Sequence, residues 1–422
     1  MTERIPCKTP GCTGTILPAT AQRTGGFCMP CVRTAARKER EEYIRQNRRE
    51  VNEFEGVTDP VEVLKIIHRP RTIDPLVHWI PYPTPEDQLY TGLDEREQRQ
   101  LAEYAESLVG DDRNGEAEQI VLCLAAFTQA PLAKCLEALV AQGSFIPSLA
   151  FRRATSELRD RLIERVELDE GNRDHILLAL AWIGDQAVVD LFARWRQRPP
   201  DWRTSLYLPP QDYSREAGWE LDEDGYRRDL YFQSCTRLLR GPSDAPELFQ
   251  AVIPSQDSCP WCRQQLTHLV QLVPAGLGLN GPFAERERVQ VTTCEVCSVF
   301  AFVFGEFDRA GHGKWSPLNQ RPEQLPDDAD DWRRLPEDSL QLAGQRPALF
   351  AASQFLPTTF SQVGGHPTWI QDATYPTCPK CGRTMMFLAQ VSRDDVEDSA
   401  EGVYYLFVCP GCRMTATTYQ QT

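Results

Sequence analysis

The sequence predicts a multidomain α+β protein that combines a small zinc ribbon, an α-helical repeat-like block and a β-containing domain with two zinc ribbons. Three observations predict this architecture. Twelve of the fifteen cysteines fall into closely spaced pairs, a central region carries apolar residues at helical spacing, and strand-like runs precede the last cysteine pairs. A chain of 422 residues exceeds one ordinary domain, so we expect four regions, at residues 1–34, 35–93, 94–242 and 243–422.

Two cysteine pairs near the end of the chain predict one zinc ribbon. Cys378 and Cys381 are separated by 27 residues from Cys409 and Cys412, and the second pair follows the aromatic and β-branched run 403–408. Two sulfurs about 2.3 Å from one ion must lie on the same side of a bend, which a Cys-x-x-Cys turn provides. The four cysteines are therefore predicted to bind Zn²⁺.

An earlier segment repeats this arrangement. This earlier copy has 31 residues between its cysteine pairs. In both copies a glutamine, Gln271 or Gln390, stands nine residues after the first pair in an apolar setting. We interpret the two copies as an internal duplication. The predicted ligands of the earlier copy are Cys259, Cys262, Cys294 and Cys297.

The motif GGHPTWIQ, followed by YPTCPKCGRTMMFLAQV and, after an acidic insertion, YYLFVCPGC, resembles the YwqG-like family of bacterial domains of unknown function. The resemblance covers residues 243–422. That family is associated with toxin–immunity loci, and it is similar to the zinc-bearing programmed-cell-death-protein-two family implicated in ribosomal-protein chaperoning. The resemblance implies a binding protein without naming its partner.

The beginning of the chain predicts a third zinc site. Its ligands would be Cys7, Cys12, Cys28 and Cys31, in a ribbon or knuckle too small to fold without a metal. The region 35–93 predicts an exposed charged helix from Val32 to about Glu55 and a proline-rich connector with a short helix over 61–68. Whether the ribbon contacts a partner or is only structural stays open.

Helical periodicity dominates the region 94–242. Helices are expected at 131–142, 149–167, 175–183 and 187–197, with a Gly184-Asp185 break, and these pairs resemble HEAT-like repeats, which commonly bind proteins. A further helix is expected at 226–239, with a domain boundary at 241–243. Buried free thiols are expected within these helices at Cys123, Cys135 and Cys235.

Composition restricts the partner and the compartment. The net charge is −15, and three filled four-thiolate zinc sites would bring it to about −21, which disfavours nucleic acid and suits a basic protein such as a toxin. No apolar stretch is long enough to span a membrane, and the chain begins without a signal peptide. Paired cysteines indicate a reducing compartment, so we expect a cytoplasmic protein.

The sequence provides little for catalysis. Each predicted zinc site has four cysteines and no open position, and no hydrolase, deaminase or phosphate-loop motif is found, so we expect no enzyme activity.

The GGHPTWIQ loop could contact a partner through Trp369 or could simply pack over the ribbon that follows. The acidic segments 324–340 and 392–402 are expected to be exposed. The candidate partner-binding residues are Trp369, Gln371, Asp327, Asp328, Asp394 and Asp395.

These observations favour an immunity protein that neutralises a basic bacterial toxin by direct binding. The first alternative is a chaperone of a basic ribosomal protein. The second is a zinc-ribbon factor that binds nucleic acid, which the negative charge disfavours.

Overall fold

The computed structural model describes residues 4–110, 113–279, 288–325, 334–398 and 400–421. The chain divides into two compact units, Met1–Pro85 and Glu86–Thr422. Helices and sheets occur in both, which confirms the α+β class. Asp327 and Asp328 lie outside the described residues.

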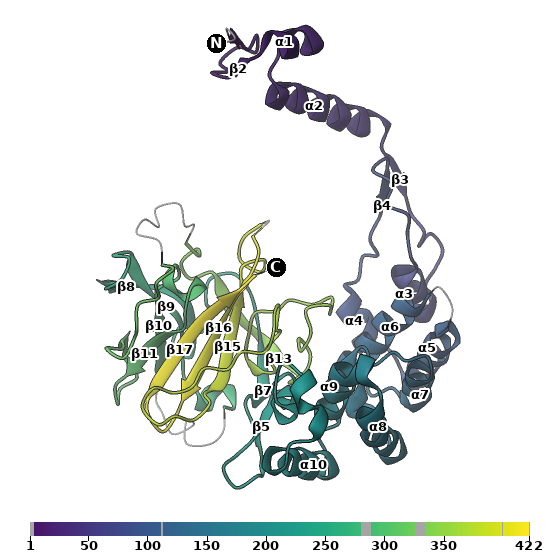
Figure 1. Ribbon diagram of the computed structural model, residues 1–422, viewed down its shortest axis with the longest axis vertical. Coiled ribbons are helices and arrows are strands. Elements are labelled where there is room, and N and C mark those ends of the chain that lie inside the picture. Colours follow the sequence, from purple (N-terminus) through teal and green to yellow (C-terminus); the bar gives the residue numbers. More distant parts are fainter. Residues whose placement is uncertain (1–3, 111–112, 280–287, 326–333, 399, 422) are drawn as a thin grey trace. The chain divides into compact units, whose positions relative to one another are not determined.

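The first unit is built from short elements and one long helix (Figure 1). The charged helix ends at Asn47, so the expectation that it reaches about Glu55 is wrong. Residues 49–51 instead form a strand that pairs in parallel with residues 77–79. The helix expected over 61–68 is confirmed. The elements are β1 (Ile5–Pro6), β2 (Thr15–Ile16), α1 (Pro18–Thr24), α2 (Met29–Asn47), β3 (Arg49–Val51), α3 (Pro60–His68) and β4 (Val77–Trp79).

The second unit begins with helices whose starts are capped as the sequence dictates. Asp94 and Glu97 form a reciprocal capping box, and Gly184 ends one helix in the left-handed region while Asp185 caps the next. HEAT-like stacking stays a prediction, because the α-helices vary from 6 to 14 residues and 3₁₀ turns interrupt them. They are α4 (Glu86–Thr91), α5 (Glu95–Leu108), α6 (Asn114–Phe127), α7 (Ala133–Ala141), η1 (Ser148–Arg153), α8 (Ser156–Leu168), η2 (Glu170–Asn172), α9 (Arg173–Ile183), α10 (Gln186–Gln197), η3 (Asp201–Ser205) and η4 (Pro210–Arg215).

In the second unit strands begin at Trp219, before the β-containing region that was expected from residue 243. The expected helix at 226–239 is wrong, because residues 232–240 form a strand of the main sheet, and the boundary expected at 241–243 therefore falls between two strands. The strands are β5 (Trp219–Leu221), β6 (Arg227–Asp229), β7 (Phe232–Arg240), β8 (Phe249–Ser258), β9 (Gln265–Leu272), β10 (Val289–Thr293), β11 (Val303–Phe307), β12 (Gly313–Trp315), β13 (Leu340–Arg346), β14 (Gln362–Gly365), β15 (Met386–Ser392), β16 (Val403–Cys409) and β17 (Met414–Gln420). Two 3₁₀ turns, η5 (Ala275–Leu277) and η6 (Cys297–Val299), lie between them.

Two antiparallel sheets enclose the main core. The larger has the order β12-β11-β17-β16-β15-β14-β7-β13, and the smaller has the order β10-β9-β8. The outer strands of the smaller sheet run beside the ends of the larger one, β8 beside β13 and β10 beside β11 and β12. The buried side chains between them include Phe249, Val270, Leu272, Val291, Phe307, Leu340, Leu388, Tyr404 and Leu406.

The two copies inferred from the sequence occupy corresponding strands. In each copy the Cys-x-x-Cys turn leads into a strand, β9 or β15, which pairs with the strand that leads to the second cysteine pair, β10 or β16. The next strands of the two copies, β11 and β17, pair with each other in antiparallel fashion. The copies therefore meet at the β11–β17 pair.

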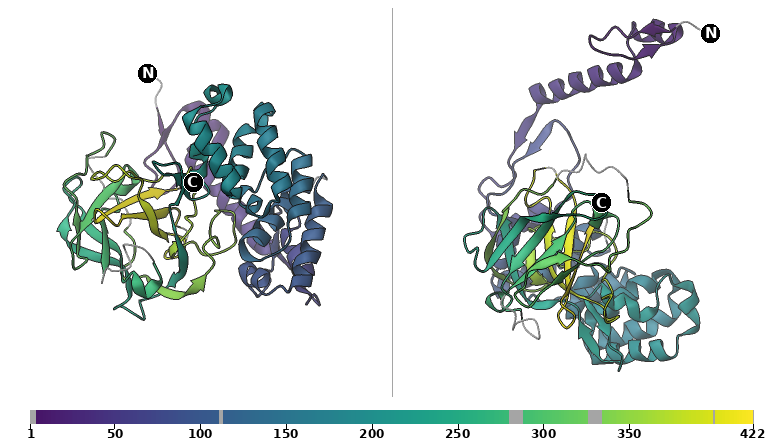
Figure 2. Two further views of the ribbon diagram at one scale, coloured as in Figure 1. Left: turned by 90° about the horizontal axis from the view of Figure 1, so that it is seen from below. Right: turned by 90° about the vertical axis from the view of Figure 1, so that its left-hand side faces the viewer.

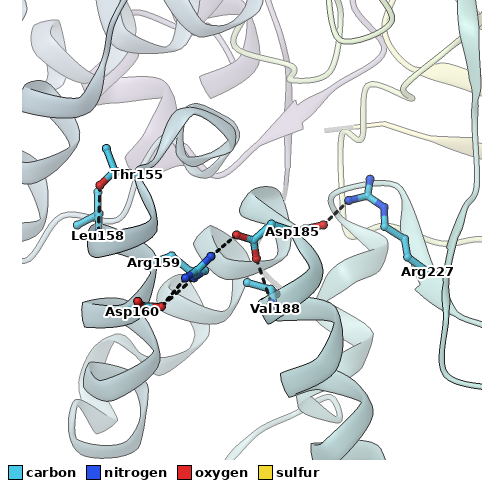
Figure 3. A network of polar contacts seen from close by, with 8 residues as sticks. Thr155, Leu158, Arg159, Asp160, Asp185, Val188 and Arg227 are labelled. Atoms are coloured by element: carbon cyan, nitrogen blue, oxygen red, sulfur yellow. Dashed lines mark hydrogen bonds and ion pairs between the residues drawn. The ribbon is translucent and has the colours of Figure 1, made fainter.

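The helices of the second unit pack beside its strands (Figure 2, left). The fully buried Trp219 donates its indole N–H to the carbonyl of Ala181 at 2.8 Å, and Arg227 Nη1 donates to the carbonyl of Gly184 at 2.7 Å. Figure 3 shows how the next residue, Asp185, continues this contact by accepting from Arg159 Nη1 at 2.5 Å. The turn between α9 and α10 is thus held by the strands on one side and by α8 on the other.

Candidate metal centres

The first cysteine pairs of the two copies are held by the same turn. The N–H of Cys259 donates to Gln264 O at 2.7 Å, and the N–H of Cys378 donates to Arg383 O at 2.8 Å. The residue after the second cysteine lies in the left-handed region in both, with φ of 68° at Arg263 and 73° at Gly382. This turn places both sulfurs of a pair on one side, as ion binding requires.

Each group of four thiols is spaced for one metal ion. The Sγ atoms within each group lie within 4.8 Å of one another, and pairs such as Cys259–Cys297 and Cys381–Cys409 are 3.7 Å apart. Four sulfurs at 2.3 Å from a tetrahedral ion would be separated by about 3.8 Å, whereas a disulfide needs about 2.05 Å. All fifteen cysteines are free thiols. The groups predicted from the sequence are therefore brought together as three four-cysteine clusters.

The N-terminal cluster lies at the start of a helix. Cys28 is the N-cap residue of α2 and Cys31 lies in its first turn, so the partial positive charge of the helix end faces the cluster. Backbone N–H groups also point at sulfur: Cys28 N donates to Cys7 Sγ at 3.2 Å and Gly14 N to Cys12 Sγ at 3.4 Å. Hydrogen bonding to the Thr9 hydroxyl and to the Cys28 backbone lowers the pKa of the Cys7 thiol to about 6. Cys7 therefore favours thiolate, the form that binds metals.

The two C-terminal clusters differ in solvent access. Cys259, Cys294 and Cys297 are almost completely buried, whereas Cys381 is exposed. Hydrogen bonds from the Cys294 and Cys297 thiols lower the pKa of the Cys259 thiol. All four positions of a tetrahedral ion are supplied by sulfur at each cluster, which is the ligand set of a structural rather than a catalytic site.

The three remaining cysteines are buried, as expected. Cys123 and Cys135 lie on α6 and α7, but Cys235 lies on β7 and not on a helix. Burial raises the pKa of the Cys135 thiol to about 12, which keeps it protonated. These thiols have the character of core residues.

The GGHPTWIQ loop is packed into the β domain. Gly364 and Gly365 have φ of 68° and 69°, and a Cβ on Gly364 would lie 2.0 Å from Ser234 O. Trp369 is 6% exposed and stacks on Tyr405 with ring centroids 4.8 Å apart. Gln371 is exposed and donates to Gln421 O at 2.9 Å.

The acidic segment 392–402 is not the exposed loop that we expected. Arg393 and Glu397 form a buried ion pair of 2.6 Å, and Val396 is 1% exposed. Asp395 Oδ2 accepts the backbone N–H groups of Phe360 and Ser361 at 3.0 and 2.7 Å. Asp394 is exposed, so it is the member of this pair of aspartates whose position suits contact with a partner.

Sequence reasoning missed a cavity of about 620 Å³ between the helices and the GGHPTWIQ loop. Its walls come from six separate stretches of the chain, so a single motif could not identify it. Only Trp369 and Gln371 had been singled out from the sequence. The lining residues are Gly115, Glu118, Gln119, Leu122, Ile146, Pro147, Ser148, Leu149, Trp182, Glu216, Ala352, Ser353, Gln354, Phe355, Trp369, Ile370, Gln371 and Asp372.

The fold and the clusters define a multidomain α+β protein with three four-cysteine sites of the structural metal type. The uncharacterized protein YpfL of Salmonella typhimurium strain LT2 is 48% identical over 426 residues, and the alignment covers 100% of this chain and 100% of that protein. The chain therefore belongs to the YpfL family. No family model matches the chain, and no solved structure matches it. None of the described helices has the length and apolar character needed to cross a bilayer.

Proposed function

We propose that each four-cysteine cluster holds one structural Zn²⁺ ion. The support is the all-thiol ligand set, its tetrahedral spacing and the short turns that carry it. Zinc binding would supply folding free energy, above all in the N-terminal cluster, whose buried hydrophobic residues are Cys7, Ile16 and Cys28. The metal would act through structure and would leave no position for a substrate.

The whole protein, in this proposal, is a cytoplasmic binding protein for a basic protein partner and not an enzyme. The observation that carries it is a net charge of −15 on a chain whose metal-type sites are closed by four sulfurs. Negative charge accelerates encounter with a basic protein and opposes contact with nucleic-acid phosphates. The resemblance to the YwqG-like family favours a toxin as the partner, with the chain acting as its immunity protein.

The two alternatives rest on the same features and differ in the partner. A chaperone would hold a basic ribosomal protein, and its client would be released to the ribosome. A nucleic-acid factor would bind DNA or RNA through its ribbons, against the repulsion of the acidic chain.

Co-purification from the native host tests this proposal. The expected result is one basic protein bound in a stoichiometric complex, toxic when expressed alone and harmless when this chain is present. A ribosomal protein in that place would replace immunity by chaperoning. Binding of DNA or RNA at physiological salt, without a protein partner, would contradict the proposal.

A further inference from the structure

The cavity between the helices and the GGHPTWIQ loop combines negative charge with aromatic walls. Three carboxylates line it, Glu118 from α6, Glu216 from the segment after η4, and Asp372 from the end of the motif. Its described lining contains no lysine, arginine or histidine. Negative groups gathered in a concave site without a compensating cation raise one another's energy, and a bound cation would relieve this.

Glu216 is the carboxylate most affected by this environment. Its Oε1 accepts the backbone N–H of Ala373 at 2.7 Å, which fixes the side chain against the β domain. Burial raises the pKa of Glu216 to about 7, and the neighbouring charge of Asp372 adds to the increase. The ionised carboxylate is thus held in place by a backbone donor while it lacks a cationic partner among the lining residues.

The aromatic side chains of the cavity suit a flat cation. Trp182 and Trp369 both line it, and Trp369 is fixed by its stacking on Tyr405. Aromatic faces attract cations, and a guanidinium group can stack on a ring while its N–H groups reach carboxylates. A lysine ammonium could make the charge contact but could not stack in this way.

The rim of the cavity is apolar and accessible. Phe355 is 68% exposed and Ile146 is 46% exposed. The loop that carries Phe355 is anchored, because Gln119 Nε2 donates to Phe355 O at 2.8 Å. Exposed apolar groups around a charged recess are typical of a surface that receives a side chain together with its flanking peptide.

We propose that this cavity receives an arginine side chain of the protein partner, with Glu216 and Asp372 contacting the guanidinium and Phe355 and Ile146 covering the flanking residues. The inference rests on the proposed function, since it assigns the place where the basic partner inserts. It also assigns a role to the GGHPTWIQ loop, whose last residues form one wall of the recess.

The test measures binding of fluorescent peptides to the full chain. One library has the form acetyl-X-X-Arg-X-X-amide, and a matched library replaces arginine by citrulline, which keeps the shape and removes the charge. We expect the arginine library to bind about tenfold more tightly at 150 mM salt. Equal binding of the two libraries would overturn the inference.

Variants of the lining residues test whether the arginine peptides bind in the cavity. The double variant Glu216→Gln with Asp372→Asn removes two charges from the cavity, and the matched control Glu103→Gln with Asp244→Asn removes two charges from exposed positions. We expect the first to weaken arginine binding about tenfold and the second to change it less than about twofold. Phe355→Arg, at a rim position that is 68% exposed, should block the recess with its own cation. Unchanged binding in the cavity variants would contradict the proposal.

Three further outcomes distinguish this inference from its alternatives and from the proposed function. A basic partner that binds the cavity variants as tightly as the unaltered chain would refute the cavity and leave the proposed function intact. If arginine amide alone displaces the library as well as the best peptide does, the occupant is a small cation and not a protein side chain. If the arginine library binds only through the cavity but no basic partner is found in the host, the proposed function is refuted instead.

Discussion

The side chain of Gln390 contacts the backbone N–H and the side-chain hydroxyl of Thr368 through the two ends of its carboxamide. Its Oε1 accepts the Thr368 N–H at 2.9 Å, and its Nε2 donates to the Thr368 hydroxyl at 2.7 Å and to Phe360 O at 2.7 Å. Gln390 and Thr368 are both fully buried. One strand residue therefore fixes the loop that presents Trp369 and the cavity wall.

Replacing Gln390 by alanine tests this relationship. The change removes the partner of the buried Thr368 N–H and of the half-buried Phe360 carbonyl, so we expect the free energy of unfolding to fall by about 2 to 4 kcal/mol. Urea denaturation measures the loss. The exposed Gln233 on β7 provides the control, and Gln233→Ala should change stability by less than about 0.5 kcal/mol. Equal effects of the two substitutions would contradict the assignment.

Gly364→Ala should disrupt the contact between β7 and β14. The new Cβ would lie 2.0 Å from Ser234 O at a φ of 68°, so we expect a loss of about 3 kcal/mol or more. Gly344 is the matched control, because it has a φ of 82° and nothing within 4 Å of its Cβ position. Gly344→Ala should cost only about 1 kcal/mol of left-handed backbone strain. Similar thermal denaturation of the two variants would show that the close approach is absent.

Ionisation of Glu216 should make stability depend on pH. Its pKa is raised from 4.5 to about 7, so the folded chain holds this proton more tightly than the unfolded chain does. The resulting stability is fully present below about pH 4.5 and is lost as pH rises through about 7. Glu216→Gln removes the titration, so we expect the variant to gain about 2 kcal/mol relative to the unaltered chain between pH 5 and pH 8. The free energy of unfolding of both proteins, measured across this pH range, tests the prediction. A difference between the two proteins that stays constant with pH would refute it.

Metal chelation should unfold the N-terminal cluster first. Residues 4–34 bury little hydrophobic surface besides Ile16 and two of the cysteines, whereas cysteines of the two C-terminal clusters belong to larger groups of buried hydrophobic residues in the β domain. We expect hydrogen exchange after chelator treatment to become fast throughout residues 4–34 while β7 and β14–β17 keep their protection. Retained protection at residues 4–34 in metal-free protein would contradict this expectation.

The cysteine clusters could be predicted from the sequence because their chemistry is local. A Cys-x-x-Cys pair determines its own turn, and the matched positions of Gln271 and Gln390 indicated the duplication that β9 and β15 display. The contacts of the two glutamines differ, however. Gln271 accepts from Gln290 on the neighbouring strand, whereas Gln390 holds a distant loop. Spacing identified equivalent positions but not their partners.

Strand β7 was mistaken for a helix for a physical reason. Phe232, Cys235, Thr236 and Leu239 repeat at helical spacing, yet the segment pairs with β13 and β14, more than a hundred residues away. Tertiary pairing overrides a local pattern in such a case. The cavity was missed similarly, because its carboxylates come from residues 118, 216 and 372, which only the folded chain brings together.

The most direct test of the account is native mass spectrometry of the folded chain, which counts bound metal ions. We predict about three Zn²⁺ per chain, falling by one in Cys381→Ser and staying unchanged in Cys135→Ser, since Cys135 lies outside the clusters. A folded chain that carries fewer than two zinc ions, or a count unaffected by Cys381→Ser, would contradict the central claim that these clusters are structural zinc sites.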